Sequence, residues 1–391
     1  LGLSSTFSSD YDTTQFLTNH ATDTAVVCVE NTSVNHLVAQ KRSITGASID
    51  GGRTVMEAVA QTYGQDLPLA NCNMSTNGYL EPGDRADVPD YARAEIITDP
   101  RLLAVATHGS RGIREAPAQP LVDRARSIRE QLEDNSAFAG RHAASGLRQR
   151  YLDLRRRLGR DLEQADLITK LMLFQESAIT PLSDFGLQPS PELDRLSAVF
   201  PRILSDPLQA QAALAFLLAR YDVSCTVTFG PNLEPNVGDD GTFTDTPIAF
   251  DFSHTDHILT QNVMWSRILG AADGLISLLK SQPYGTGTMW DRSMVYIASD
   301  FGRSKNRPPG AQTFGSGHDL NNGNIFVSPL LRGNRVYGGV DTATCRTFGF
   351  DPSTGEPDRN AEIREGHLYS LVCQALGIDF TGRYDMSGLL K

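Results

Sequence analysis

Short apolar runs alternate along the chain with longer segments whose apolar positions recur at helical spacing. Thr24–Glu30 and residues 293–299 are rich in apolar and β-branched residues, a pattern typical of strands buried within a sheet. Residues 324–331 predict another strand, whereas Val55–Tyr63 and residues 262–282 have the spacing of amphipathic helices. This alternation predicts an α/β fold, with a mainly parallel central sheet and helices on both faces.

The middle of the chain, residues 121–222, has helical spacing almost throughout. We interpret it as a helical insertion within a single domain that spans residues 1–391. The helices expected in it cover residues 121–133, 147–177, 192–204 and 208–221. Its first part is rich in arginine, which is typical of a solvated helical face and would also suit a docking surface for an acidic partner.

Charge and composition narrow the classes of function. Lys and Arg total 35 against 46 for Asp and Glu, so the net charge is −11, which argues against a general nucleic-acid binder. No apolar run is long enough to predict a transmembrane segment. The chain begins with Leu1, from which we expect that a leader has been removed or that an upstream segment is missing.

The five cysteines are scattered and have no zinc-ribbon spacing. Cys72, Cys225 and Cys345 lie near loop signals, so one pair among them is a candidate disulfide if the protein is exported.

The densest group of chemically active residues lies in a segment that we expect to follow a strand. Asp251, His254, Asp256 and His257 fall within seven residues. Carboxylate and imidazole together are ligands that suit zinc and similar divalent ions. The alternative is a solvated polar loop.

Two further motifs lie next to predicted strands. Asp300 ends the strand at 293–299, and Arg303 follows with a guanidinium that matches the oxygens of phosphate or sulfate. Asp300 would otherwise serve as a turn cap. His318 and Asp319 come after two glycines and before the strand at 324–331, which makes His318 a candidate third ligand.

A third position lies between the first strand and the next helix. A helix start there exposes backbone N–H groups to an anion, and Ser33 or His36 would point toward it. A simple helix cap is the alternative reading of this segment.

The order of these motifs resembles that of a known family. Asn35-His36 and Thr45-Gly46 follow the first strand, and a helical insertion and the Asp/His loop come next. Asp-Phe-Gly-Arg at 300–303, Gly-x-Gly-His-Asp at 315–319 and a closing helix complete the series. The chain resembles the exported bacterial family called domain of unknown function 1501. That family is similar to the alkaline phosphatases, sulfatases and cofactor-independent phosphoglycerate mutases.

The resemblance implies an alkaline-phosphatase-like fold and metal ions at the strand ends. A first ion would take Asp251, His254 or His257, and His318, with Asp319 beside it. A second ion would use Asp300, but Phe301 stands where the family pattern places a histidine, and the first-strand Asp has no counterpart. Counting back from Gly46 places His36 at the nucleophile position, with Ser33 as a nearby hydroxyl.

We therefore expect an exported, periplasmic or cell-surface protein that resembles metal-dependent phosphate or sulfate ester hydrolases, with an incomplete second metal site. Zinc is the favoured ion, calcium and manganese are alternatives, and the absence of any ion remains open. The competing hypothesis is a non-catalytic binding or assembly subunit on the same fold. The expected partner is an anionic small-molecule ester or another protein, with no nucleic acid.

Overall fold

The computed structural model describes residues 11–106, 117–153, 155–156, 162, 165–231, 236–237, 243–244, 249–304, 308–311, 314–341 and 343–391. The fold is mixed α/β. The chain divides into a larger unit, Leu1–Pro100 with Ala198–Lys391, and a smaller unit, Arg101–Ser197. The single domain with an insertion at 121–222 stays a prediction. Helix α11 (Pro207–Arg220), which falls in that range, belongs to the larger unit.

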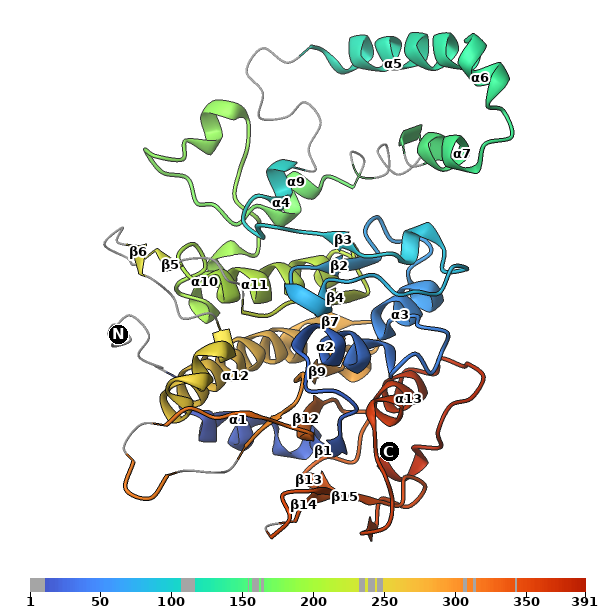
Figure 1. The fold of residues 1–391 in the computed structure, drawn as a ribbon. Coiled ribbons are helices and arrows are strands. Elements are labelled where there is room, and N and C mark those ends of the chain that lie inside the picture. Colours follow the sequence, from blue (N-terminus) through green and yellow to red (C-terminus); the bar gives the residue numbers. More distant parts are fainter. Residues whose placement is uncertain are drawn as a thin grey trace. The chain divides into compact units, whose positions relative to one another are not determined.

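Two small sheets form the centre of the larger unit (Figure 1). The four-stranded sheet has the order β13 (Arg335–Tyr337), β1 (Thr24–Glu30), β12 (Asn321–Val327), β9 (Val295–Ile297). The three-stranded sheet has the order β3 (Glu95–Ile96), β2 (Asn71–Asn73), β4 (Thr226–Thr228).

The strand directions differ from the expected mainly parallel central sheet. The three-stranded sheet is parallel, but β12 runs antiparallel to both β1 and β9, and only β13 is parallel to β1. The reason lies between β9 and β12, where β10 (Gly302–Arg303) and β11 (His318–Asp319) pair as a hairpin. A hairpin returns the chain beside the strand it leaves, so β12 is antiparallel to β9.

Alternate residues of β1 anchor the main core. Ala25, Val27 and Val29 are fully buried in a cluster that includes residues of α3 (Val55–Tyr63) and α13 (Glu365–Ala375). Burial of this apolar surface is the main stabilising contribution that the sheet provides.

Helix α2 (His36–Thr45) begins and ends at clear capping residues. The side chain of Asn35 accepts a hydrogen bond from the backbone N–H of Val38 and caps the start. Gly46 ends the helix with φ of +60°, and a Cβ there would lie 2.6 Å from Cβ of Tyr369. Glycine is therefore required by both backbone conformation and space.

A second group of helices packs together in the same unit. It consists of α1 (Thr13–His20), α11 and the long α12 (His257–Ser281), which Asp256 caps. Strand β9 is less buried than its sequence predicts. The pattern of residues 293–299 predicts a fully buried strand, but β9 is half-buried and lines a cavity.

Small antiparallel pairs complete the larger unit, and its short helical turns connect these elements. The pairs involve β5 (Asn236–Val237), β6 (Phe243–Thr244), β7 (Pro283–Tyr284), β8 (Gly287–Thr288), β14 (Gly339–Val340), β15 (Thr347–Phe350) and β16 (Pro357–Asp358). The turns are η2 (Ala21–Asp23), η3 (Asn77–Tyr79), η4 (Asp90–Ala92), η7 (Ala249–His254), η8 (Met289–Arg292) and η9 (Ser387–Leu389).

The smaller unit is helical. It contains α4 (Leu103–Ala106), α5 (Gln119–Asp134), α6 (Ala137–Arg141), α7 (Gly146–Asp153), α9 (Leu167–Leu171), η6 (Leu182–Phe185) and most of α10 (Leu193–Val199). The prediction of a helix over residues 147–177 is wrong, because α7 and α9 are separate helices, residues 165–166 form a turn and residues 172–177 are irregular. Among the described segments, no helix has both the length and the apolar character needed to cross a membrane.

All five cysteines are free thiols, so the candidate disulfide among Cys72, Cys225 and Cys345 is not formed. Burial raises the pKa of Cys72 to about 12 and that of Cys225 to about 11, which keeps both thiols protonated.

Candidate metal centre

Three histidines from distant parts of the sequence meet at one place in the larger unit. His36 is the first residue of α2, His254 ends η7 and His318 begins β11. One ring nitrogen from each lies within 4.8 Å of the other two, and the Nε2 atoms of His254 and His318 are 3.0 Å apart. Convergent imidazole nitrogens are the donor arrangement of a transition-metal site.

The orientation of His36 is set by Asp300, which follows β9. The Nδ1 atom of His36 lies 2.6 Å from Oδ2 of Asp300. A carboxylate oxygen can only accept, so Nδ1 donates this hydrogen bond and Nε2 is the ring nitrogen left to bind a metal. Asp300 is itself held in place, because its backbone carbonyl accepts a hydrogen bond from the Asn31 side chain and its Oδ1 accepts one from the Phe301 N–H.

His318 is fixed by a backbone carbonyl. Its Nδ1 lies 2.9 Å from the oxygen of Val34, which accepts a hydrogen bond and leaves Nε2 directed at His254. Burial, with smaller contributions from His36 and Arg303, lowers the pKa of His318 and favours its neutral form. The neutral ring is the form that binds a metal.

A close approach of two backbones brings His254 to His318. At Gly315 a Cβ would lie 1.9 Å from the carbonyl oxygen of His254, so no larger residue fits without a backbone shift. On either side of it, Phe314 accepts a hydrogen bond from the N–H of His257, and the N–H of Ser316 donates to Ser253. These bonds hold the segment before β11 against η7.

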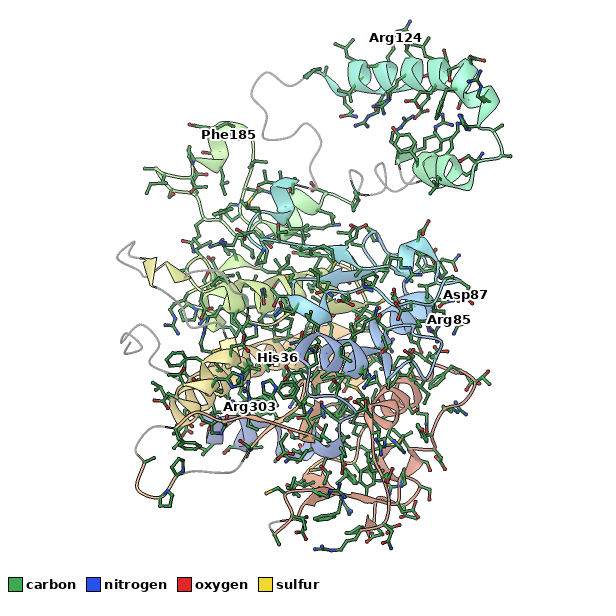
Figure 2. All side chains as sticks on the ribbon, viewed as in Figure 1. His36, Arg85, Asp87, Arg124, Phe185 and Arg303 are labelled. Atoms are coloured by element: carbon green, nitrogen blue, oxygen red, sulfur yellow. The ribbon has the colours of Figure 1, made fainter. Side chains whose placement is uncertain are left out.

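Arg303 and Asp251 lie at the edge of the three-histidine group, and Figure 2 labels His36 and Arg303. Nη1 of Arg303 is 3.2 Å from Nε2 of His254, and Nη2 donates to the carbonyl of Phe250. Oδ1 of Asp251 is 3.7 Å from Nε2 of His36. The group thus combines imidazole donors, a guanidinium that can bind an anion and a half-exposed carboxylate.

Other residues singled out from the sequence make local contacts instead. Nδ1 of His257 lies 3.0 Å from Oγ of Ser316, and Asp319 accepts a hydrogen bond from the N–H of Leu320. Ser33 accepts one from the N–H of Asn35 and so shapes the turn before α2. Among the described residues, the three-histidine group does not include these side chains.

The surroundings of Asp251 also differ from the expectation. We expected it directly after a strand, but residues 249–254 form the helical turn η7. The carbonyl of Val34, which orients His318, has no counterpart among the expected site residues. A backbone carbonyl can accept a hydrogen bond whatever the side chain is, so the residue type does not reveal this role.

Comparisons with known proteins do not assign this site, because no family model, curated protein or solved structure matches the chain.

Proposed function

We propose that the chain is a hydrolase of phosphate or sulfate monoesters that depends on a single divalent metal ion, with zinc as the favoured ion. The observation that carries the proposal is the convergence of ring nitrogens from His36, His254 and His318 beside Arg303. Three histidines and an open fourth position are a known donor set of catalytic zinc.

The residues present fit zinc better than calcium or manganese. Nδ1 of His36 and Nδ1 of His318 are each tied to an oxygen acceptor, which leaves Nε2 of both rings available as a donor. Zinc prefers such nitrogen donors, whereas calcium prefers oxygen. The Asp300 contact has the form of the carboxylate–histidine pair that commonly supports a metal ligand.

The residues beside the three-histidine group give little support for a second metal ion. Phe301 is buried and carries no donor atom, and its ring centroid lies 4.7 Å from that of His36 and 4.1 Å from that of His318. Asp300 would serve here as the partner of His36 and not as a ligand. The proposal therefore assigns His36 to metal binding and not to nucleophilic attack.

A divalent ion supplies Lewis acidity, which polarises an ester oxygen and lowers the pKa of water. The guanidinium of Arg303 would bind the non-bridging oxygens of the ester. Asp251, whose Oδ1 lies near Nε2 of His36, would accept the proton of the attacking water as a general base. Asp300 would keep the imidazole of His36 in its orientation.

Membership of the domain of unknown function 1501 family and export to the periplasm or cell surface are part of the same proposal. They are supported by the order of motifs in the sequence. The hydrolase function has its own support in the three-histidine group.

The test is metal analysis of the purified full chain, followed by hydrolysis of 4-nitrophenyl phosphate and 4-nitrophenyl sulfate with added zinc, manganese or calcium. We expect about one zinc per chain and metal-dependent turnover. His254→Ala and His318→Ala should lose both, whereas the exposed His142→Ala serves as the matched control. Arg303→Ala should keep the metal and raise KM. A wild-type chain without bound metal would overturn the proposal.

A non-catalytic assembly subunit is the second candidate, and one observation favours it. No residue of α5 is buried, and Leu121, Ile128 and Leu132 on it are exposed. Exposed apolar side chains of this kind are typical of surfaces that bind other proteins. Bound zinc without turnover of either ester would favour this candidate.

A further inference from the structure

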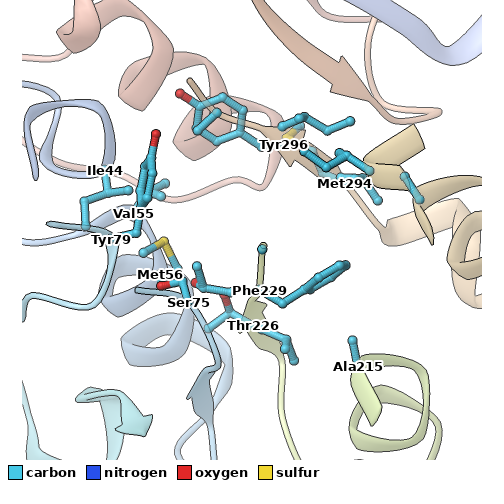
Figure 3. Close-up of a pocket in the computed structure, with 18 of the residues that line it drawn as sticks. Ile44, Val55, Met56, Ser75, Tyr79, Ala215, Thr226, Phe229, Met294 and Tyr296 are labelled. Atoms are coloured by element: carbon cyan, nitrogen blue, oxygen red, sulfur yellow. The ribbon is translucent and has the colours of Figure 1, made fainter. Parts of the chain in front are cut away.

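A large cavity in the larger unit reaches His36, one member of the three-histidine group. Its volume is about 1180 Å³, and His36, Asp251 and Arg303 form part of its wall. Away from them the wall is mainly apolar, as Figure 3 shows. Representative apolar lining residues are Ile44, Val55, Met56, Leu275, Met294 and Leu376.

Elements of both sheets and of the helices α2, α3, α11, α12 and α13 form this wall. Strands β9 and β4 both line it, and Ala215 of α11 and Ala272 of α12 contribute small side chains. The strand residues are half-buried although the β9 sequence is typical of a buried strand. The cavity is the reason that these apolar residues are not packed against protein.

A space of this size and polarity suits an apolar occupant. The cavity is partly open to solvent, so an apolar occupant would remove its apolar wall from contact with water. Apolar walls also hold water poorly. Pockets of similar size with a few polar groups at one end are typical of sites for small molecules.

The wall carries few charged side chains beside its many apolar ones. Tyr79 and Tyr296 line the interior, and burial raises the pKa of both hydroxyls, so they stay neutral. Tyr296 donates to Oδ1 of Asn324 at 3.3 Å. Asp300 also lines the cavity, and two further charged lining residues, Asp222 and Arg292, are exposed. An occupant would therefore meet the guanidinium of Arg303 and the carboxylates of Asp251 and Asp300 near His36, and mainly apolar side chains elsewhere.

We propose that the substrate is a phosphate or sulfate monoester of a long aliphatic alcohol. The inference rests on the proposed hydrolase function and names its substrate class. The anionic headgroup lies at Arg303 and the three histidines, and the aliphatic chain fills the cavity. Water adds to the phosphorus or sulfur atom, the bond to the ester oxygen breaks, and the proton from water passes to the departing alcohol. The products are the free alcohol and inorganic phosphate or sulfate.

The test is calorimetric binding of butyl, hexyl and octyl phosphate below their micellar concentrations, with the full chain both zinc-loaded and treated with a chelator. Affinity should rise with each added methylene, by up to about fourfold, because each one leaves water for the apolar wall. Octyl sulfate in place of octyl phosphate distinguishes the two headgroups. Near-ultraviolet circular dichroism reports whether the chain stays folded.

Variants that fill the cavity make the test specific. Ala215→Phe and Ala272→Phe each place a ring in the space, so both should weaken the binding of octyl phosphate more than that of butyl phosphate and reduce the dependence on chain length. Ala137→Phe, at an exposed position of α6, is the matched control and should behave as wild type.

The outcomes separate this inference from the proposed function. Equal affinity for butyl and octyl phosphate in a zinc-loaded, ester-cleaving protein would overturn the inference alone. Chain-length dependence that persists in the chelator-treated protein would support the cavity as the binding site of the aliphatic chain. Chain-length dependence without any turnover of octyl phosphate or octyl sulfate would overturn the proposed hydrolase function. The bound molecule would then not be a substrate.

Discussion

The imidazole of His36 and the carboxylate of Asp300 are joined by a contact of 2.6 Å between Nδ1 and Oδ2. The two residues belong to different parts of the fold, since His36 begins α2 and Asp300 follows β9. The contact fixes both the tautomer and the direction of one donor in the three-histidine group. Metal affinity should therefore depend on a residue that does not itself bind the metal.

Removing the Asp300 carboxylate should weaken metal binding without removing a ligand. We expect Asp300→Ala to lower zinc affinity about 10–100-fold, as is typical when the partner of a ligating histidine is lost. Asp300→Asn, which keeps an acceptor but loses the charge, should have a smaller effect. Competition with a chromophoric chelator measures the affinity. Asp319→Asn is the control, since Asp319 bonds the N–H of Leu320. Wild-type affinity in Asp300→Ala would contradict this role.

The close approach at Gly315 offers a test of how His254 and His318 are brought together. A methyl group at this position would lie 1.9 Å from the carbonyl of His254, so the backbone of Gly315→Ala must move. Overpacking of this kind costs about 1–3 kcal/mol, and we expect reduced zinc affinity as well. At Gly317 the nearest atom would be Oγ of Ser304 at 3.6 Å, so Gly317→Ala should be tolerated. Thermal unfolding and chelator competition measure the two effects, and similar behaviour of both variants would refute the argument.

The buried carboxylate of Glu57 should be important for the stability of the larger unit. Its Oε1 lies 2.6 Å from Nη1 of Arg93, and its Oε2 accepts the N–H of Thr54 in a capping box. Glu57→Ala should lower the free energy of unfolding by about 3 kcal/mol, because it breaks a buried pair and a helix cap.

The control for Glu57 is the exposed Glu81, which pairs with the partly exposed Lys41. Glu81→Ala should change the free energy of unfolding by less than about 1 kcal/mol. Urea unfolding of both variants provides the comparison. A loss as small in Glu57→Ala as in Glu81→Ala would show that the buried pair contributes little.

His367 should make the fold less stable as the pH falls. Burial lowers the pKa of its imidazole from 6.5 to about 4, and Nδ1 accepts a hydrogen bond from the N–H of Arg364. Between these two values the unfolded chain binds a proton that the folded chain does not. The contribution of the neutral ring to stability is therefore present above pH 6.5 and is lost as the pH falls toward 4, by at most about 3 kcal/mol.

The measurement for His367 is the slope of unfolding free energy against pH. His367→Gln should lower that slope by up to about 1.4 kcal/mol per pH unit between pH 4.5 and 6, which corresponds to one proton. The slope is informative even if the variant is less stable overall. An identical slope in wild type and variant would mean that folding does not lower the pKa of His367.

Local sequence pattern predicted individual elements better than their arrangement. The strand Thr24–Glu30 and the helix Val55–Tyr63 have the expected bounds, because apolar periodicity and caps act within a few residues. The local pattern could not predict the direction of β12, because an apolar run is the same in a parallel and an antiparallel strand. The half-buried state of β9 depends on a cavity formed by elements distant in sequence.

For the candidate site, too, the sequence predicted the individual residues better than their arrangement. The sequence indicates three candidate residues, His36, His254 and His318. Polar residues beside the predicted strands of an α/β protein are candidates for its functional site. Their assignment to different roles depended on the resemblance, which placed His36 at a nucleophile position. Distances between side chains, such as 3.0 Å between Nε2 of His254 and Nε2 of His318, follow from packing and not from spacing along the chain.

The pairing of β10 with β11 has a consequence for how the chain can be altered. Arg303 lies opposite His318 in this hairpin, and the N–H of Ser304 donates to the carbonyl of Gly317. The register of the two strands, and not the number of residues that join them, sets the separation between the guanidinium and the imidazole. Residues can therefore be inserted or deleted between Ser304 and Phe314 while Arg303 and His318 keep their places.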